Sequence, residues 1–228
     1  QYVELWRAGL AGAGIINPLN ARLAPDEITY ILNDSTARVV FVDAENADRI
    51  HSLRDRLTAV EHVVLIGDGT RGDCDAVLDD LIGDATSVLP SEPDDDAPAV
   101  LMYTGGTTGL PKGVVLDQRA VALVVYRMLI DFPIEPGARF LNFMPMFHIG
   151  SITSWGLLLP IGGQTVVMPA YEPQAVNAAI RDHEVSLIGA VPTMLSMMLD
   201  QPDFEPAMLA SLRLILYGAA PMPPSLLD

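Results

Sequence analysis

The feature that most constrains the fold is an alternation of short apolar runs with helix-like segments. Residues 38–43 (RVVFVD) and 62–67 (HVVLIG) are β-branched and apolar, as buried strands are. Before the first of these strands, residues 25–33 carry Ile28, Ile31 and Leu32 on one helical face. Between the two strands, the segment from residue 44 to Leu57 reads as a second helix. Strands that alternate with helices assemble into parallel sheets with helices on their faces. The sequence therefore predicts an α/β fold with mostly parallel sheets.

The same alternation continues after residue 98. Predicted strands cover residues 99–104, 113–116, 139–144, 164–169, 186–191 and 212–218. Predicted helices cover residues 119–129 and 152–159, the segment around 176–183, and a segment that begins at Pro192. The second half is therefore expected to be a doubly wound lobe, in which ligands bind beyond the carboxyl ends of the strands.

An acidic segment separates the two runs of elements. Residues 68–98, which include SEPDDDAP, are rich in charge and turn-forming residues. We expect a first lobe at about residues 1–67, a linker at about 68–98 and a second lobe at about 99–228. The chain begins without Met in a helix-like segment and stops where Pro223 and Pro224 would start another helix, so we expect both ends to be cuts in a longer protein.

Charge and composition limit the partners. The chain has 29 acidic and 13 basic residues, a formal charge of -16, which disfavours nucleic acid and anionic membrane surfaces. No apolar run is long enough to span a bilayer, so we expect no integral membrane contact and a cytoplasmic protein. The single cysteine, Cys74, has acidic neighbours that should raise its thiol pKa, and we interpret it as inert.

The stretch LMYTGGTTGLPKGVVL, residues 101–116, combines glycines and threonines with Lys112, the only lysine in the chain. Glycines let a backbone approach an anion closely, and hydroxyl and ammonium groups donate to phosphate oxygens. The spacing fits neither the P-loop of nucleoside triphosphatases nor the dinucleotide-binding fingerprint. The stretch therefore predicts a different phosphate-binding loop. The alternative is a tight glycine hairpin with a lysine at its edge, which would not need the threonines.

The segment YTGGTTGLPKGVVL resembles the phosphate-loop signature of the adenylate-forming, or AMP-binding, superfamily, which includes acyl-CoA synthetases, firefly luciferase and the adenylation domains of peptide synthetases. Other segments resemble the same superfamily in the same order: GAGIINPLN, LAPDEITYILNDS, PMFHIGS, VPTML and YGAAPM. Together they cover nearly the whole chain. The resemblance implies part of the large N-terminal domain, without the small C-terminal domain.

This resemblance implies a two-step reaction that uses ATP, Mg²⁺ and coenzyme A. A carboxylate attacks the α-phosphate of ATP, pyrophosphate leaves, and the acyl group passes from the adenylate to a thiol. The implied catalytic residues are Lys112 and His148, with His148 at the mouth of the acyl pocket and Thr107 beside the metal. The implied nucleotide-binding residues are Thr104, Gly105, Gly106, Thr107, Thr108, Gly109, Lys112, Gly218, Ala219, Ala220 and Pro221.

The chain departs from the superfamily pattern in two places. Gly105 stands where the family usually has Ser, which removes one hydroxyl that neighbouring threonines replace. Residues 117–120 (DQRA) stand in place of a segment of the Thr-His-Arg-Asn type. The second departure bears on how the loop is supported.

The choice of substrate depends on the residues after His148, which are apolar or small and include no carboxylate to hold an amine. We therefore expect an apolar acid, a medium- or long-chain fatty acid, and a fatty acyl-CoA synthetase. Two alternatives stay open: the adenylation domain of another acid-activating enzyme, and a non-catalytic nucleotide-binding fragment. The acceptor, coenzyme A or a carrier protein, and a homodimeric state also stay open.

Overall fold

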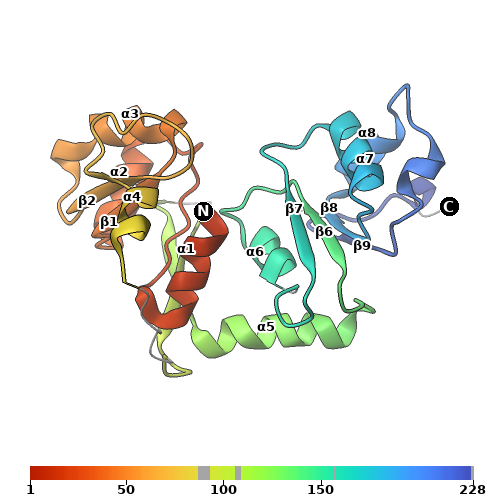
Figure 1. Cartoon of the computed structure of the whole chain (residues 1–228), viewed down its shortest axis with the longest axis horizontal. Helices are drawn as coiled ribbons and strands as arrows, with labels where there is room; N and C mark the ends of the chain where they lie inside the picture. Colours follow the sequence, from red (N-terminus) through yellow and green to blue (C-terminus); the bar gives the residue numbers. More distant parts are fainter. Residues whose placement is uncertain (87–92, 106–108, 157, 227–228) are drawn as a thin grey trace. The chain divides into compact units, whose positions relative to one another are not determined.

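The computed structural model describes residues 1–86, 93–105, 109–156 and 158–226. The chain divides into two compact units, Gln1–Val121 and Ala122–Asp228. Figure 1 shows the order of their elements along the chain. Within the described residues, none of the helices has both the length and the hydropathy that crossing a membrane requires.

The first unit contains a three-stranded parallel sheet in the order β1-β2-β3. Its strands are β1 (Val39–Val42), β2 (His62–Leu65) and β3 (Ala76–Val77), and its helices are α1 (Tyr2–Ala8), α2 (Pro25–Asp34), α3 (Ala44–Ser52) and α4 (Leu78–Asp84), with helical turns at Gly9–Ala13 and Arg54–Arg56. Apolar side chains of α2, α3, β1 and β2 form one buried cluster. The predicted strands and helices of residues 25–67 are thereby confirmed.

Helix α2 begins where its sequence indicates. Pro25 stands in its first turn, where a missing N–H does no harm, and the Glu27 carboxylate accepts a hydrogen bond from the Ala24 N–H at 2.8 Å. Ile28, Ile31 and Leu32 are 1%, 1% and 4% exposed, so the predicted face is the buried one. This face packs α2 against the parallel sheet.

Part of the segment expected to be a linker has regular structure. Strand β3 and helix α4 lie inside residues 68–98, and β3 pairs with β2 in register from Val64↔Ala76 to Leu65↔Val77. The acidic residues Asp79 and Asp80 lie in the first turn of α4, where they complement the helix dipole. The acidic residues of this segment therefore lie partly in the first turn of a helix and partly in an irregular connection.

Strands β4 (Pro98–Thr104) and β5 (Lys112–Asp117) form a separate two-stranded antiparallel sheet in the first unit. We expected these residues to belong to the parallel second lobe, and that expectation was wrong. The connection between them is too short for a crossover, and only an antiparallel partner can follow so closely. The glycine-rich stretch is therefore the loop of a hairpin, in which Thr104 pairs with Lys112.

The second unit contains a four-stranded parallel sheet in the order β7-β6-β8-β9. Its strands are β6 (Arg139–Asn142), β7 (Gln164–Val167), β8 (Leu187–Ala190) and β9 (Leu214–Tyr217). Its helices are α6 (Ile149–Gly156), α7 (Pro173–Asp182) and α8 (Pro192–Leu199), with helical turns at Pro206–Leu209 and Pro224–Leu226, and α5 (Gln118–Asp131) enters it from the first unit. Every predicted strand and helix of residues 119–218 is confirmed, with ends that differ by a few residues.

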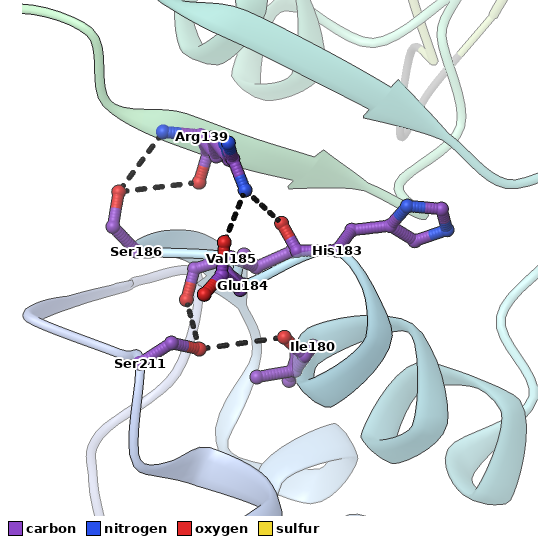
Figure 2. Close-up of polar contacts among 7 residues, drawn as sticks. All are labelled: Arg139, Ile180, His183, Glu184, Val185, Ser186 and Ser211. Atoms are coloured by element: carbon purple, nitrogen blue, oxygen red, sulfur yellow. Dashed lines mark hydrogen bonds and ion pairs between the residues drawn. The ribbon is translucent and has the colours of Figure 1, made fainter.

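Polar groups join the amino ends of these strands (Figure 2). The Arg139 guanidinium donates to the Glu184 carboxylate at 2.9 Å, and the Arg139 N–H donates to the Ser186 hydroxyl oxygen at 2.9 Å. The Ser211 hydroxyl donates to the Val185 carbonyl at 2.8 Å. These bonds fix the amino edge of the sheet, so the carboxyl edge is the one left for a ligand.

Candidate active site

The loop between β4 and β5 begins at Thr104 and ends at Lys112, which face each other across the hairpin. The Thr104 hydroxyl lies 3.4 Å from the Lys112 carbonyl oxygen, and both residues are exposed. Gly105 and Gly109 border the loop in open space, since a Cβ added at either would meet no atom within 4 Å. The predicted contacts of Gly106, Thr107 and Thr108 lie outside the described residues.

The ammonium group of Lys112 is available to an anion. It forms no ion pair with any residue in the described part of the chain, although the protein has 29 acidic residues. An exposed lysine across the hairpin from the exposed Thr104 places an ammonium and a hydroxyl group at the same end of the hairpin, and both can donate to a phosphate. The described part of the loop therefore carries two of the predicted donors.

Two residues that sequence reasoning missed support the start of this loop. The Tyr103 hydroxyl, on β4 directly before Thr104, donates a hydrogen bond to the Asp34 carboxylate at 2.6 Å. Burial, and then the hydrogen bond to the negative Asp34, raise the pKa of the Tyr103 hydroxyl. The two residues are far apart in the sequence, and no motif connects them.

Gly113, which follows Lys112, packs against the side chains of Leu101 and Tyr103 on β4. A Cβ at Gly113 would lie 2.9 Å from the Leu101 Cδ1 atom and 3.2 Å from the Tyr103 Cζ atom. The space above Gly113 is therefore filled by the side chains of β4, and a larger residue would displace them. The glycine after Lys112 is a packing requirement of the hairpin.

In the second unit, two of the predicted segments follow strands of the same parallel sheet. The segment with His148 follows β6, and the segment 218–221 follows β9, and both strands pair with β8. Because parallel strands end at one edge, both segments belong to the carboxyl edge of this sheet. Lys112 belongs to the first unit and His148 to the second.

His148 is exposed, so it does not belong to the core of its unit. Its Nδ1 atom accepts a hydrogen bond from the Gly150 N–H at 3.1 Å. A ring nitrogen that accepts carries no proton, so the neutral ring has its proton on Nε2. The Nε2–H is the group that His148 can present to a ligand.

The first turn of α6, which begins directly after His148, is held by a buried pair that the sequence did not reveal. The Ser151 hydroxyl donates to the Asn142 Oδ1 atom at 2.8 Å, and the two residues are 1% and 0% exposed. The Asn142 amide nitrogen has no hydrogen-bond partner among the described residues. An asparagine inside the apolar run RFLNFM was the available signal, because a buried amide needs a reason.

The segment Gly218, Ala219, Ala220 and Pro221 is exposed throughout. Ala219 has a backbone φ of 65°, a left-handed conformation that is uncommon for a residue with a side chain. Strain of this kind is found at ligand-binding segments more often than elsewhere. Small residues at the end of β9 leave the backbone open to a flat ligand.

Two other expectations concern metal and thiol chemistry. No group of three His, Cys, Asp or Glu residues that could hold a metal ion is found where the structure describes the chain, and the predicted metal contact, Thr107, is outside those residues. Cys74 is 6% exposed. Burial, and then the neighbouring Asp75 and Asp73, raise the pKa of its thiol, the direction that the sequence predicted.

Comparison with known proteins adds independent findings. A family model described as "AMP-binding enzyme" matches residues 1–228. The feruloyl-CoA synthase of an Amycolatopsis species is 34% identical over 228 residues, which cover 99% of this chain and 43% of the relative. The long-chain-fatty-acid–CoA ligase FadD13 of Mycobacterium tuberculosis is 31% identical over 211 residues, which cover 92% of this chain and 41% of the relative.

A solved structure agrees in fold. The anthranilate CoA ligase AuaEII, in complex with anthranoyl-AMP, superposes with a TM-score of 0.91 at 24% identity and covers 99% of this chain and 44% of that one. At this identity the likeness shows the fold alone. The chain spans less than half the length of the relatives it matches.

Proposed function

The chain belongs to the AMP-binding enzyme family, and on that premise we propose that its full-length protein activates a carboxylic acid with ATP and transfers the acyl group to coenzyme A. The acid first forms an acyl-adenylate with release of pyrophosphate. The thiol of coenzyme A then displaces AMP to give the thioester. The relatives named above as CoA ligases or synthases support this reaction class.

The observation that carries the proposal is Lys112 at the end of a glycine and threonine loop, where it forms no ion pair with any residue that the structure describes. Negative charge builds up on the leaving pyrophosphate as the bond to the α-phosphate breaks. Lys112, the Thr104 hydroxyl and the loop N–H groups are the donors that bind this charge. The role of these groups is to position and stabilise charge, so no covalent step falls to them.

Magnesium would be bound in this site together with the nucleotide, through its phosphate groups. The described residues contain no cluster of three ligands that would hold the ion alone. Mg²⁺ is usually bound through substrate phosphates and only one or two protein groups. In the proposal Thr107 is that protein group, and the ion supplies positive charge to the triphosphate.

The acyl side of the site is assigned to the carboxyl edge of the second unit. His148 offers its Nε2–H at the entrance for the acid, and the backbone of residues 218–221 separates the adenine from the acyl chain. Ile149 and Gly150, which follow His148, carry no charge to hold an amine. A medium- or long-chain fatty acid is the proposed substrate, and FadD13 is a relative named for such acids.

Feruloyl-CoA synthase is named for an aromatic acid, so the assay must cover both chemistries. The experiment measures acid-dependent exchange of pyrophosphate into ATP by the full-length protein, with saturated fatty acids of graded length and a parallel set of aromatic acids. We expect the highest exchange with a fatty acid of medium or long chain. Highest exchange with an aromatic acid would overturn the proposed substrate, and no exchange with any acid would overturn the reaction.

A second part of the proposal concerns the 228 residues alone. The family resemblance implies that a lysine of the small C-terminal domain orients the carboxylate and the α-phosphate, and Lys112 is the only lysine within the 228 residues. We expect the 228-residue chain to release neither pyrophosphate nor thioester when it is incubated with ATP, magnesium, coenzyme A and the preferred acid. Turnover comparable to that of the full-length protein would contradict this.

A further inference from the structure

The hydrogen bond between Tyr103 and Asp34 joins the hairpin to the end of helix α2, immediately before the glycine-rich loop. We infer that these two residues are a positioning pair, which holds Thr104 and Lys112 in the arrangement that adenylate formation needs. The inference rests on the proposed function, and it adds two residues that touch neither nucleotide nor acid.

The geometry of the contact is that of a strong hydrogen bond. The Tyr103 hydroxyl oxygen lies 2.6 Å from the Asp34 Oδ2 atom, a length typical of a hydroxyl that donates to a carboxylate. Asp34 is the last residue of α2, and the helix is anchored in the core through Ile28 and Leu32. A rigid helix end therefore holds the tyrosine by its hydroxyl.

The ring of Tyr103 passes this constraint to the opposite strand. Tyr103 pairs with Gly113, and the next pair along the hairpin is Thr104 with Lys112. The Tyr103 ring lies over Gly113, where an added Cβ would be 3.2 Å from the Cζ atom. The ring therefore packs across both strands, one residue pair away from Thr104 and Lys112.

The end of the hairpin next to the loop has little other packing to hold it. Val114 and Val115 on β5 are 43% and 60% exposed, whereas the buried residues of the hairpin, Ala99 and Val100, lie near the other end of β4. A two-stranded hairpin is only marginally stable where no buried face supports it. A single polar contact therefore accounts for a larger share of its stability than it would in a packed sheet.

The test uses Tyr103→Phe, which keeps the ring and removes only the hydroxyl. In the full-length protein we expect kcat for pyrophosphate exchange to fall by roughly threefold to tenfold, the effect of losing one hydrogen bond to a charged group, with the KM for the acid unchanged. Asp34→Asn keeps an acceptor oxygen and should fall between the wild type and Tyr103→Phe. Tyr126→Phe, at a tyrosine 57% exposed on α5, is the matched control and should leave kcat unchanged.

A second readout does not depend on activity. Lys112 is the only lysine in the 228-residue chain, so a lysine-specific endoprotease can cut it at one bond, between Lys112 and Gly113. Because both residues are paired in the hairpin, cleavage requires local opening. We expect cleavage in Tyr103→Phe to be severalfold faster than in the wild type and in Tyr126→Phe, with a matching smaller increase in Asp34→Asn.

Equal cleavage rates in Tyr103→Phe and Tyr126→Phe would overturn the positioning pair, whatever the activities are. Faster cleavage with an unchanged kcat would also overturn it, since the loop would then be loosened without consequence. A full-length protein that shows no exchange with any acid refutes the proposed function instead, and with it the catalytic role of the pair.

Discussion

The hairpin of β4 and β5 and the parallel sheet of β6 to β9 position their site residues in different ways. Phe140, Leu141 and Ile188 in the parallel sheet are all 0% exposed, whereas Val115 in the hairpin is 60% exposed. Packing of β6 therefore holds the segment of His148, while backbone pairing and a few polar contacts hold Lys112 at the exposed end of the hairpin. A packed strand makes the segment that follows it insensitive to surface changes, and an exposed hairpin end leaves the loop sensitive to each contact.

The largest effect on activity is expected at the hairpin. Lys112→Ala should lower acid-dependent pyrophosphate exchange by about two orders of magnitude, because a charged contact to the leaving group is lost. Lys112→Arg keeps the positive charge but places it on a planar guanidinium, so its exchange rate should fall less than that of Lys112→Ala. Urea unfolding should show the same stability for both variants as for the wild type. An unchanged exchange rate in Lys112→Ala would remove the loop from the mechanism.

The largest effect on stability is expected in the parallel sheet, and matched valines test it. Val185→Ala, at a side chain 0% exposed beside β8, should lower the free energy of unfolding by about 2 kcal/mol, through lost burial and a cavity. Val115→Ala in the hairpin should change it by less than about 0.5 kcal/mol. Chemical denaturation of the two variants measures both values, and equal losses would show that the hairpin is as well packed as the sheet.

A smaller loss is expected at the buried pair that joins the end of β6 to the first turn of α6. Ser151→Ala leaves the buried Asn142 Oδ1 atom without its donor and should lower the free energy of unfolding by about 1 to 2 kcal/mol. The double variant Ser151→Ala with Asn142→Leu replaces both polar partners and should recover part of this loss. Thermal unfolding compares the three proteins, and a double variant less stable than Ser151→Ala would argue that Asn142 has a further essential contact.

The smallest effect is expected at His148, and it concerns selectivity. His148→Ala should change the ratio of kcat/KM between a medium-chain and a long-chain acid by roughly threefold, a size typical of altered contacts in an apolar pocket. The KM for ATP should stay the same. A variant that loses affinity for ATP while its acid preference is unchanged would place this side chain on the nucleotide.

The sequence predicted the elements well where periodicity and burial agree. Residues 25–33 were expected to be helical and α2 is Pro25–Asp34, and residues 164–169 were expected to contain the strand that is Gln164–Val167. The pairing of β4 with β5 was mispredicted because the alternation rule was carried across a loop too short for a parallel crossover. Connection length, which the sequence does contain, would have corrected it.

The site was predictable only where its residues are neighbours in the sequence. The stretch from Thr104 to Lys112 can be recognised in the sequence by its glycines, its threonines and the only lysine of the chain. The contact of Tyr103 with Asp34 depends on which helix end comes to lie beside β4, and composition carries no information about that. Pairs between distant elements have to be read from the fold.

The backbone of Ile16 runs beside β4, and this arrangement has a consequence for the order of folding. The Ile16 N–H donates to the Ala99 carbonyl at 3.0 Å, and the Leu101 N–H donates to the Ile16 carbonyl at 2.8 Å. These bonds join the beginning of the chain to a strand that the ribosome makes much later, and pairings of such long sequence separation form slowly. The sheet of β1 to β3 lies between the two partners in sequence, so it can form before β4 is available to pair with Ile16. The segment around Ile16 is therefore expected to be among the last of the first unit to gain protection from hydrogen exchange during synthesis.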